Sequence, residues 1–439
     1  MAEVAFALFA VLLGCLLVLR FSTLEILEIS SVFAVGTLFG IGFCSCLFFL
    51  CRLLFPGIAH LSLWLESLLF LLVTADLIRT RRRLNFHWPR LSGLELSLGA
   101  LLVLAIAIGT FAMFSAYRLN PQGQWDAWSI WNLRAKFLTA EGPLVARAWS
   151  PLLTGTHPEY PLLLSAFVGR CWQYSGTTTA AAPIATSYLF WIALLAVAAS
   201  GMAKLRSLPV GLIFALVLAT TPRLLHEAVS QYADIPLAAF MLTSIMLLLQ
   251  KQPLWAGFFA GFAGFTKDEG ILFAAVFVLI VLLFERVQFV SALMGIVVPA
   301  CLFVGFKLFL APAKVSLLAH SSFAGLTDLA RYGQIAAAFF GELGDMMLGG
   351  YHPLYPVVVM ALLLGLDRSH WAQWKIPMTV CALLCAGFLA VYLVTPNDLS
   401  WQLGTSLSRV LVQLWPIFIF TSFLSLRTHA SLSKQAVSK

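Results

Sequence analysis

Apolar runs of helix-spanning length recur from one end of this chain to the other. A helix needs about 20 apolar residues to cross the hydrocarbon core of a bilayer. Across 439 residues, 61% are hydrophobic and only 10% are charged, a balance that no soluble domain has. The runs are continuous rather than alternating, which excludes a membrane β-barrel. The sequence therefore predicts an all-α polytopic membrane protein.

The lengths of these runs predict about 13 transmembrane helices, an odd number that would put the two termini on opposite sides. The expected helices span residues 4–20, 31–52, 59–78, 93–115, 180–203, 208–222, 231–250, 253–266, 270–285, 288–311, 353–366, 376–395 and 409–426. We divide the chain into an N-terminal three-helix unit (1–80), a core (81–311) with a large loop (116–179), a second loop (312–352) and the C-terminal helices with a tail (353–439). The apolar segment 160–174 is short and holds Arg170, so we expect a half-buried helix there rather than a span.

Basic residues in the short connections predict the orientation. The densest basic run, residues 79–83, is expected on the cytoplasmic side. Alternation then places six further basic connections on that side, at Arg20, at Lys204 with Arg206, at Lys251, at Arg286, at Arg368 with Lys375, and in the tail with Arg427, Lys434 and Lys439. The net charge of +8 is therefore an orientation signal, and it does not indicate a nucleic-acid partner. The polar intervals fall on the opposite, extracytoplasmic face.

The longest polar and aromatic interval, 120–165, is the strongest candidate for function. Asp126 lies there between Trp125 and Trp128, as in a segment at a membrane–water interface. Residues 127–138 can form an interfacial helix, and we expect its stripe of Trp128, Trp131, Ala135 and Leu138 to face the membrane. Asp126 suits either the N-cap of this helix or a catalytic carboxylate, and the two roles are compatible.

Further candidates stand on the same face, each with a structural alternative. Asp234 follows Tyr232 at the mouth of an apolar run and is either a cap or a functional carboxylate. Lys267 and Glu269 occupy a polar hinge that is either a phosphate site or a solvated turn. Arg409 begins the last apolar run, where it either holds an anionic headgroup or snorkels. Arg134, His157 and Glu159 complete the set of candidate site residues. The loop with His320 and His352 is long enough to form a lid over an acceptor.

Other chemistries lack their sequence signals. The eight cysteines lie mostly in apolar runs and show no disulfide or metal spacing. The chain has no P-loop, no dinucleotide-binding glycine fingerprint and no Ser-His-Asp signature. We expect no required cofactor. A divalent metal ion between Asp126 and Asp234 stays open, because the sequence shows no decisive ligand set for it. A lipid-linked donor is then the plausible activated substrate on the extracytoplasmic face.

Four short motifs on the expected extracytoplasmic face begin at Trp125 (WDAW), His157 (HPEYPLL), Tyr232 (YADIP) and Thr266 (TKDEG). Together they resemble the bacterial integral-membrane glycosyltransferases of the C superfamily, relatives of protein O-mannosyltransferases and lipid A aminoarabinose transferases. The resemblance covers roughly residues 93–409. Ala127 follows Asp126 where protein O-mannosyltransferases carry two consecutive acids, and this departure speaks against a protein acceptor.

The resemblance implies a multi-helix bundle in which interfacial helices of the first large extracytoplasmic loop carry a catalytic aspartate. That residue would be Asp126, with Asp234 as the second acid. We expect transfer of a sugar from a polyprenyl-phosphate donor to a hydroxyl of a glycan, lipid or protein acceptor, with inversion, at a bacterial inner membrane. Lys267, Arg409 and Arg134 would hold the donor phosphate, and six residues would contact substrate: Trp125, Trp128, His157, Glu159, Tyr232 and Glu269. A flippase of polyprenyl-linked sugars and a glycan polymerase or ligase stay open as alternatives.

Overall fold

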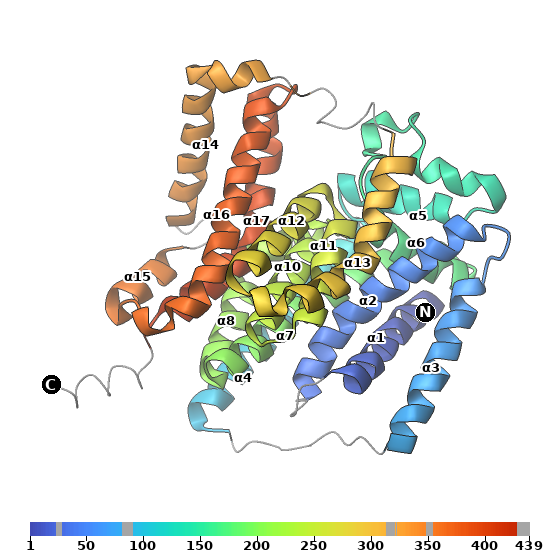
Figure 1. Cartoon of the computed structure of the whole chain (residues 1–439), viewed down its shortest axis with the longest axis horizontal. Coiled ribbons are helices and arrows are strands. Elements are labelled where there is room, and N and C mark those ends of the chain that lie inside the picture. The colour runs from blue at the N-terminus through green and yellow to red at the C-terminus, as the bar shows by residue number, and fades with distance from the viewer. Residues whose placement is uncertain (23–28, 81–90, 313–320, 322, 348–353, 428–439) are drawn as a thin grey trace.

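The computed structural model is a bundle of helices (Figure 1). It describes residues 1–22, 29–80, 91–312, 321, 323–347 and 354–427. Within these ranges the only β-structure is an isolated bridge between Leu366 and Leu426, which confirms the all-α prediction. The α-helices are α1 (Ala2–Phe21), α2 (Ile29–Leu54), α3 (Leu61–Thr80), α4 (Gly93–Leu119), α5 (Leu133–Leu138), α6 (Leu163–Ser175), α7 (Ala181–Leu205), α8 (Leu208–Thr220), α9 (Pro222–Val229), α10 (Asp234–Leu249), α11 (Pro253–Thr266), α12 (Asp268–Phe284), α13 (Phe289–Gly305), α14 (Leu329–Met347), α15 (Tyr355–Leu364), α16 (Trp371–Val394) and α17 (Leu399–Ser425). Short 3-10 or π turns are η1 (Ala127–Asn132), η2 (Gly142–Trp149), η3 (Thr154–Thr156), η4 (Arg286–Gln288), η5 (Phe306–Leu310), η8 (Phe323–Thr327) and η9 (Arg368–His370).

Eight helices in the described part of the chain are long and apolar enough to cross a membrane, and a ninth span results if α8 and α9, bent by 61° at their break, are counted together. The chain is thus an integral membrane protein, but 13 spans are not confirmed. The reason is length, because α10, α11, α12 and α15 have 16, 14, 17 and 10 residues, fewer than the roughly 20 that a span needs. Nearly every residue of α10 is buried. Its apolar sequence therefore marks a helix packed inside the bundle.

The basic connections pair up as the alternation predicted. Lys251, after α10, lies 2.9 Å from Glu285, which follows α12. Arg206, after α7, lies 3.8 Å from Asp367, which precedes α16. Each ion pair joins two connections that were expected to share a side, and we call this side the basic end. Residues 81–83 and the tail beyond Arg427 lie outside the described ranges.

The opposite end, which we call the polar end, carries η1, α5 and α6. Three buried polar contacts tie this region to the N-terminal helices. Arg170 of α6 donates to both carboxylate oxygens of Glu66 in α3, at 2.8 and 2.5 Å, and neither side chain is exposed. Arg52 at the end of α2 donates to the carbonyl of Leu138 at 3.1 Å, and Glu3 accepts from the backbone N–H of Thr179 at 2.8 Å. Helices α1–α3 therefore hold the segment that presents Asp126.

The stretch 312–352, expected as a loop, contains the 19-residue helix α14. Arg331 near its start donates to the carbonyls of Tyr392 and Thr395, at 2.9 and 3.0 Å. These bonds attach α14 to the polar end of α16. His320 and His352, which were assigned to a lid in this stretch, lie outside the described residues.

Helices α11 and α13 touch through glycines. A Cβ on Gly257 of α11 would come within 2.0 Å of the carbonyl oxygen of Ala292 in α13, a backbone atom that cannot move aside. Small residues permit such close helix contact in membranes. We expect Gly257→Ala to destabilise the protein by about 1–3 kcal/mol through overpacking, measured as a lower thermal unfolding midpoint in detergent micelles. Gly99→Ala in α4 is the matched control, because a Cβ there meets nothing within 4 Å and alanine favours a helix over glycine by about 1 kcal/mol. Equal midpoints for the two variants would contradict the tight contact.

Candidate active site

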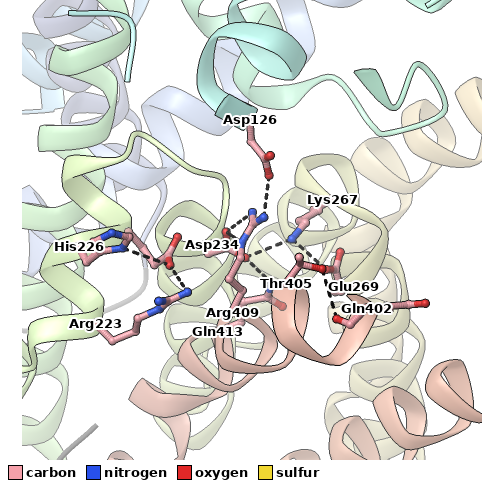
Figure 2. A network of polar contacts seen from close by, with 11 residues as sticks. Asp126, Arg223, His226, Asp234, Lys267, Glu269, Gln402, Thr405, Arg409 and Gln413 are labelled. Carbon is pink, nitrogen blue, oxygen red and sulfur yellow. Dashed lines mark hydrogen bonds and ion pairs between the residues drawn. The ribbon is translucent and has the colours of Figure 1, made fainter. Parts of the chain in front are cut away.

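Asp126 precedes the π-turn η1, the first structured element of the long polar interval. Its side chain makes no capping hydrogen bond, so the capping interpretation is not supported. Instead, its Oδ2 lies 2.7 Å from Nη1 of Arg409 in α17 (Figure 2). A π-turn is rare and often occurs at functional sites. The turn thus presents a carboxylate to a basic residue almost 300 positions away in the chain.

Asp234 is the first residue of α10 and is completely buried. Its Oδ1 accepts from Nζ of Lys267 at 3.1 Å and from Nε2 of Gln413 at 2.5 Å. Its Oδ2 accepts from Nη2 of Arg409 at 2.8 Å (Figure 2). A buried charge is tolerated only when it is paired and hydrogen-bonded in this way. Asp234 therefore fixes the positions of both basic side chains.

Lys267 stands in extended conformation between α11 and α12, with only 5% of the residue exposed. Its Nζ lies 2.9 Å from Glu269 as well as 3.1 Å from Asp234. Burial alone would lower the pKa of Lys267, but these two carboxylates outweigh it and hold the pKa above its ordinary value. The alternative of a solvated turn is therefore wrong, and Lys267 keeps its positive charge at neutral pH.

Arg409 is the centre of the cluster. Its side chain is 17% exposed and bridges Asp126 and Asp234, while its guanidinium lies 4.5 Å from the centroid of the Tyr232 ring. Paired with two acids and an aromatic face, it does not snorkel. One basic residue thus joins η1, α10 and α17 at the polar end. We call Asp126, Asp234, Lys267, Glu269 and Arg409 the ion-pair cluster.

Arg134 was expected at the donor phosphate, but it belongs to a different group of contacts. It is completely buried and donates to the carbonyls of Ile130 and Tyr160, at 3.0 and 2.6 Å. Burial lowers the pKa of Arg134 to about 10, opposed by the nearby carboxylate of Glu159. A side chain enclosed in this way braces η1 against the 157–160 turn, so its contacts do not favour a phosphate-binding role.

His157 and Glu159 also belong to this second group. Nδ1 of His157 lies 3.0 Å from Oε1 of Glu159, and the imidazole stacks on Tyr160 with the ring centroids 4.5 Å apart. His157 adopts a left-handed backbone with a φ of 50°, which shapes the turn. These contacts lie within the 157–160 turn, and a contact of His157 and Glu159 with substrate stays a prediction.

Of the four residues in the expected interfacial stripe, only Trp128 is exposed. Trp125 and Trp128 are 60% and 44% exposed and pack edge to face at 4.6 Å, as expected of side chains at a membrane surface. Trp131, Ala135 and Leu138 are instead buried inside the protein. The π-turn explains the difference, because an i→i+5 turn breaks the 3.6-residue period on which the stripe depended.

Gln413 is a member of the site that the sequence analysis missed. It is completely buried beside Asp234. A signal existed, because Gln402, Ser406, Arg409 and Gln413 follow i, i+4, i+7, i+11 and share one face of α17. Glu227 of α9 is also completely buried, with Oε1 2.8 Å from Nη2 of Arg223.

Among the described residues, no group of three or more His, Cys, Asp or Glu side chains is arranged to hold a metal ion. Comparison with protein families, with curated proteins and with solved structures finds no match. What the site does is therefore inferred from its own chemistry.

Proposed function

We propose that the protein is a membrane glycosyltransferase that moves a sugar from a polyprenyl-phosphate donor to an acceptor hydroxyl, with inversion. One observation carries the proposal: a partly exposed carboxylate, Asp126, pairs with Arg409, and Asp234 joins Arg409 to Lys267 at the same end of an apolar helical bundle. This is where the phosphate of a lipid carrier would rest, because its isoprenoid chain stays in the bilayer. The resemblance to C-superfamily glycosyltransferases points the same way.

The charges of the cluster suggest how donor binding and catalysis are linked. Two cations, Arg409 and Lys267, already share three carboxylates, so an arriving phosphate must displace one of them. Asp234 is completely buried and held by three side chains, whereas Asp126 is 18% exposed and meets Arg409 alone among its ion pairs. Asp126 is thus the exchangeable partner. A phosphate on Arg409 would release the Asp126 carboxylate for use as a base.

The transfer then follows from the residues in place. The acceptor oxygen attacks the anomeric carbon while Asp126 takes its proton. The bond from the anomeric carbon to the phosphate oxygen breaks, and its electron pair leaves with the polyprenyl phosphate. The leaving group gains one negative charge, which Arg409 and Lys267 are placed to stabilise. A single displacement inverts the anomeric centre. The positive-inside rule puts this end on the extracytoplasmic face, which in a bacterium is the outer face of the inner membrane.

A flippase of polyprenyl-linked sugars is the competing function, and the broken pair α8–α9 favours it. Transporters place binding sites near the bilayer midplane on such broken helices. Here, however, four of the five residues of the ion-pair cluster lie at helix ends, namely the start of α10, the α11–α12 junction and the start of η1, while Arg409 reaches them from the eleventh residue of α17. That placement favours chemistry at a surface over passage through the centre.

The experiment that separates the two functions uses purified full-length protein in sealed vesicles with a polyprenyl-phosphate sugar labelled in the sugar. A transferase releases polyprenyl phosphate and moves the label to an acceptor, while a flippase moves intact donor between leaflets. We expect consumption of donor, reduced when Arg409 is replaced by glutamine. Movement of label across the membrane without any loss of donor would overturn the proposal. Mass spectrometry of surface glycans from a deletion strain would then identify the acceptor, and whether it is a growing glycan.

A further inference from the structure

Tyr232, whose ring lies against Arg409, also lines a small cavity. The cavity lies between η1, α6, α7 and the first turn of α10, and has a volume of about 20 Å³. Its polar lining includes Trp131, Asn132, Ser187, Gln231 and Tyr232. Such a volume holds one water-sized group. Because Tyr232 also lies against Arg409, the cavity and the proposed reaction centre share a wall.

Two residues of this lining each carry a buried polar atom without a hydrogen-bond partner, the indole Nε1 of Trp131 and the amide Oε1 of Gln231. The two residues are only 2% and 7% exposed. Nε2 of Gln231 donates to the carbonyl of Pro121 at 3.2 Å, which leaves Oε1 as the free atom of that amide. Gln231 also adopts a left-handed backbone with a φ of 59°. Buried polar atoms nearly always have partners, so something outside the chain is expected to supply them here.

We propose that this cavity is a subsite for one neutral hydroxyl substituent of a sugar. Trp131 Nε1 can only donate and Gln231 Oε1 can only accept. A hydroxyl does both, accepting from the indole and donating to the amide. A phosphate or carboxylate would face the amide oxygen without a proton to give, and an ammonium has no lone pair for the indole. The ligand class is therefore a neutral sugar, recognised through a single hydroxyl substituent.

The inference rests on the proposed function for one point only, that the sugar arrives on a polyprenyl-phosphate donor. Binding of the sugar itself can therefore be tested without a lipid donor. Ligand-detected saturation-transfer NMR on the full-length protein in detergent micelles would use neutral methyl pyranosides as probes, together with their single-deoxy derivatives. We expect saturation transfer to at least one pyranoside. The deoxy derivative that lacks the hydroxyl in the cavity should bind about tenfold more weakly, the loss expected for one buried hydrogen-bonding pair.

Two protein variants complete the test. Trp131→Phe and Gln231→Met should each weaken binding of the same pyranoside by about tenfold. Trp172→Phe is the matched control, because Trp172 is equally buried but donates to the carbonyl of Thr179, away from the cavity lining. If no pyranoside binds, or if all single-deoxy derivatives bind as tightly as the parent, the subsite is wrong and the cavity holds water. If the pyranoside binds as described but no lipid-linked sugar is consumed, the subsite stands and the transferase proposal fails.

Discussion

Asp126→Asn is expected to lower the turnover of sugar transfer by about 10²–10⁴-fold, the usual contribution of general base catalysis. The amide cannot take the proton of the acceptor hydroxyl, yet it keeps the size of the carboxylate. The fold should survive, because the side chain is 18% exposed and caps no helix. The measurement is turnover of purified enzyme at saturating polyprenyl-phosphate sugar, with unfolding midpoints recorded in parallel.

The KM for the donor tells whether Asp126 acts as a general base or only as the ion-pair partner of Arg409. Removing the carboxylate also frees Arg409 for phosphate, so the variant should bind donor at least as tightly as the wild type while turning it over slowly. Asp398→Asn is the matched control at the same end, since Asp398 caps α17 through the backbone N–H of Trp401 at 2.8 Å and asparagine is an equally good cap. If Asp126→Asn kept wild-type turnover, Asp126 would be only a structural counter-ion of Arg409.

The convergence of Asp126, Asp234, Lys267 and Arg409 was foreseen from the sequence for an energetic reason. Ionisable residues beside apolar runs are costly unless they are paired or functional, so each stood out against a chain with few charges. The alternation of basic connections along the chain then placed all four residues on the extracytoplasmic face. Their common end could be predicted, but their ion pairs could not, because Asp126 and Arg409 are brought together only by tertiary packing.

Two expectations, the role of Arg134 and the number of spans, were not met by the structure, and each has a physical reason. Arg134 looked like a free cation near Asp126, but its direction depends on η1, where the π-turn rotates the following residues away from the helical period. The 13 expected spans are not confirmed, because a helix buried in protein is as apolar as one facing lipid. Helix α10, with 16 residues, is an example. Periodicity and hydropathy report burial, and they do not say whether lipid or protein covers a surface.

Asp234→Asn should produce the largest loss of stability in the site, about 3–5 kcal/mol, as found when one partner of a buried ion pair is removed. Arg409 and Lys267 would then share only Asp126 and Glu269, while Gln413 would face an amide in place of the carboxylate it now donates to. The thermal unfolding midpoint in detergent micelles measures the loss. Asp345→Asn on the exposed face of α14 is the control, and it should change the midpoint little.

A second substitution shows whether unpaired charge is the cause. Adding Lys267→Met to Asp234→Asn removes one of the two cations left without their carboxylate, so the double variant should regain part of the lost stability. The coupling between the two sites would then differ clearly from zero, as expected of residues in direct contact. Additive losses would mean that Asp234 stabilises the protein by packing at the start of α10 rather than by balancing Lys267 and Arg409. In that case the two cations would stay in place without it, and the ordering role that we assign to Asp234 would be wrong.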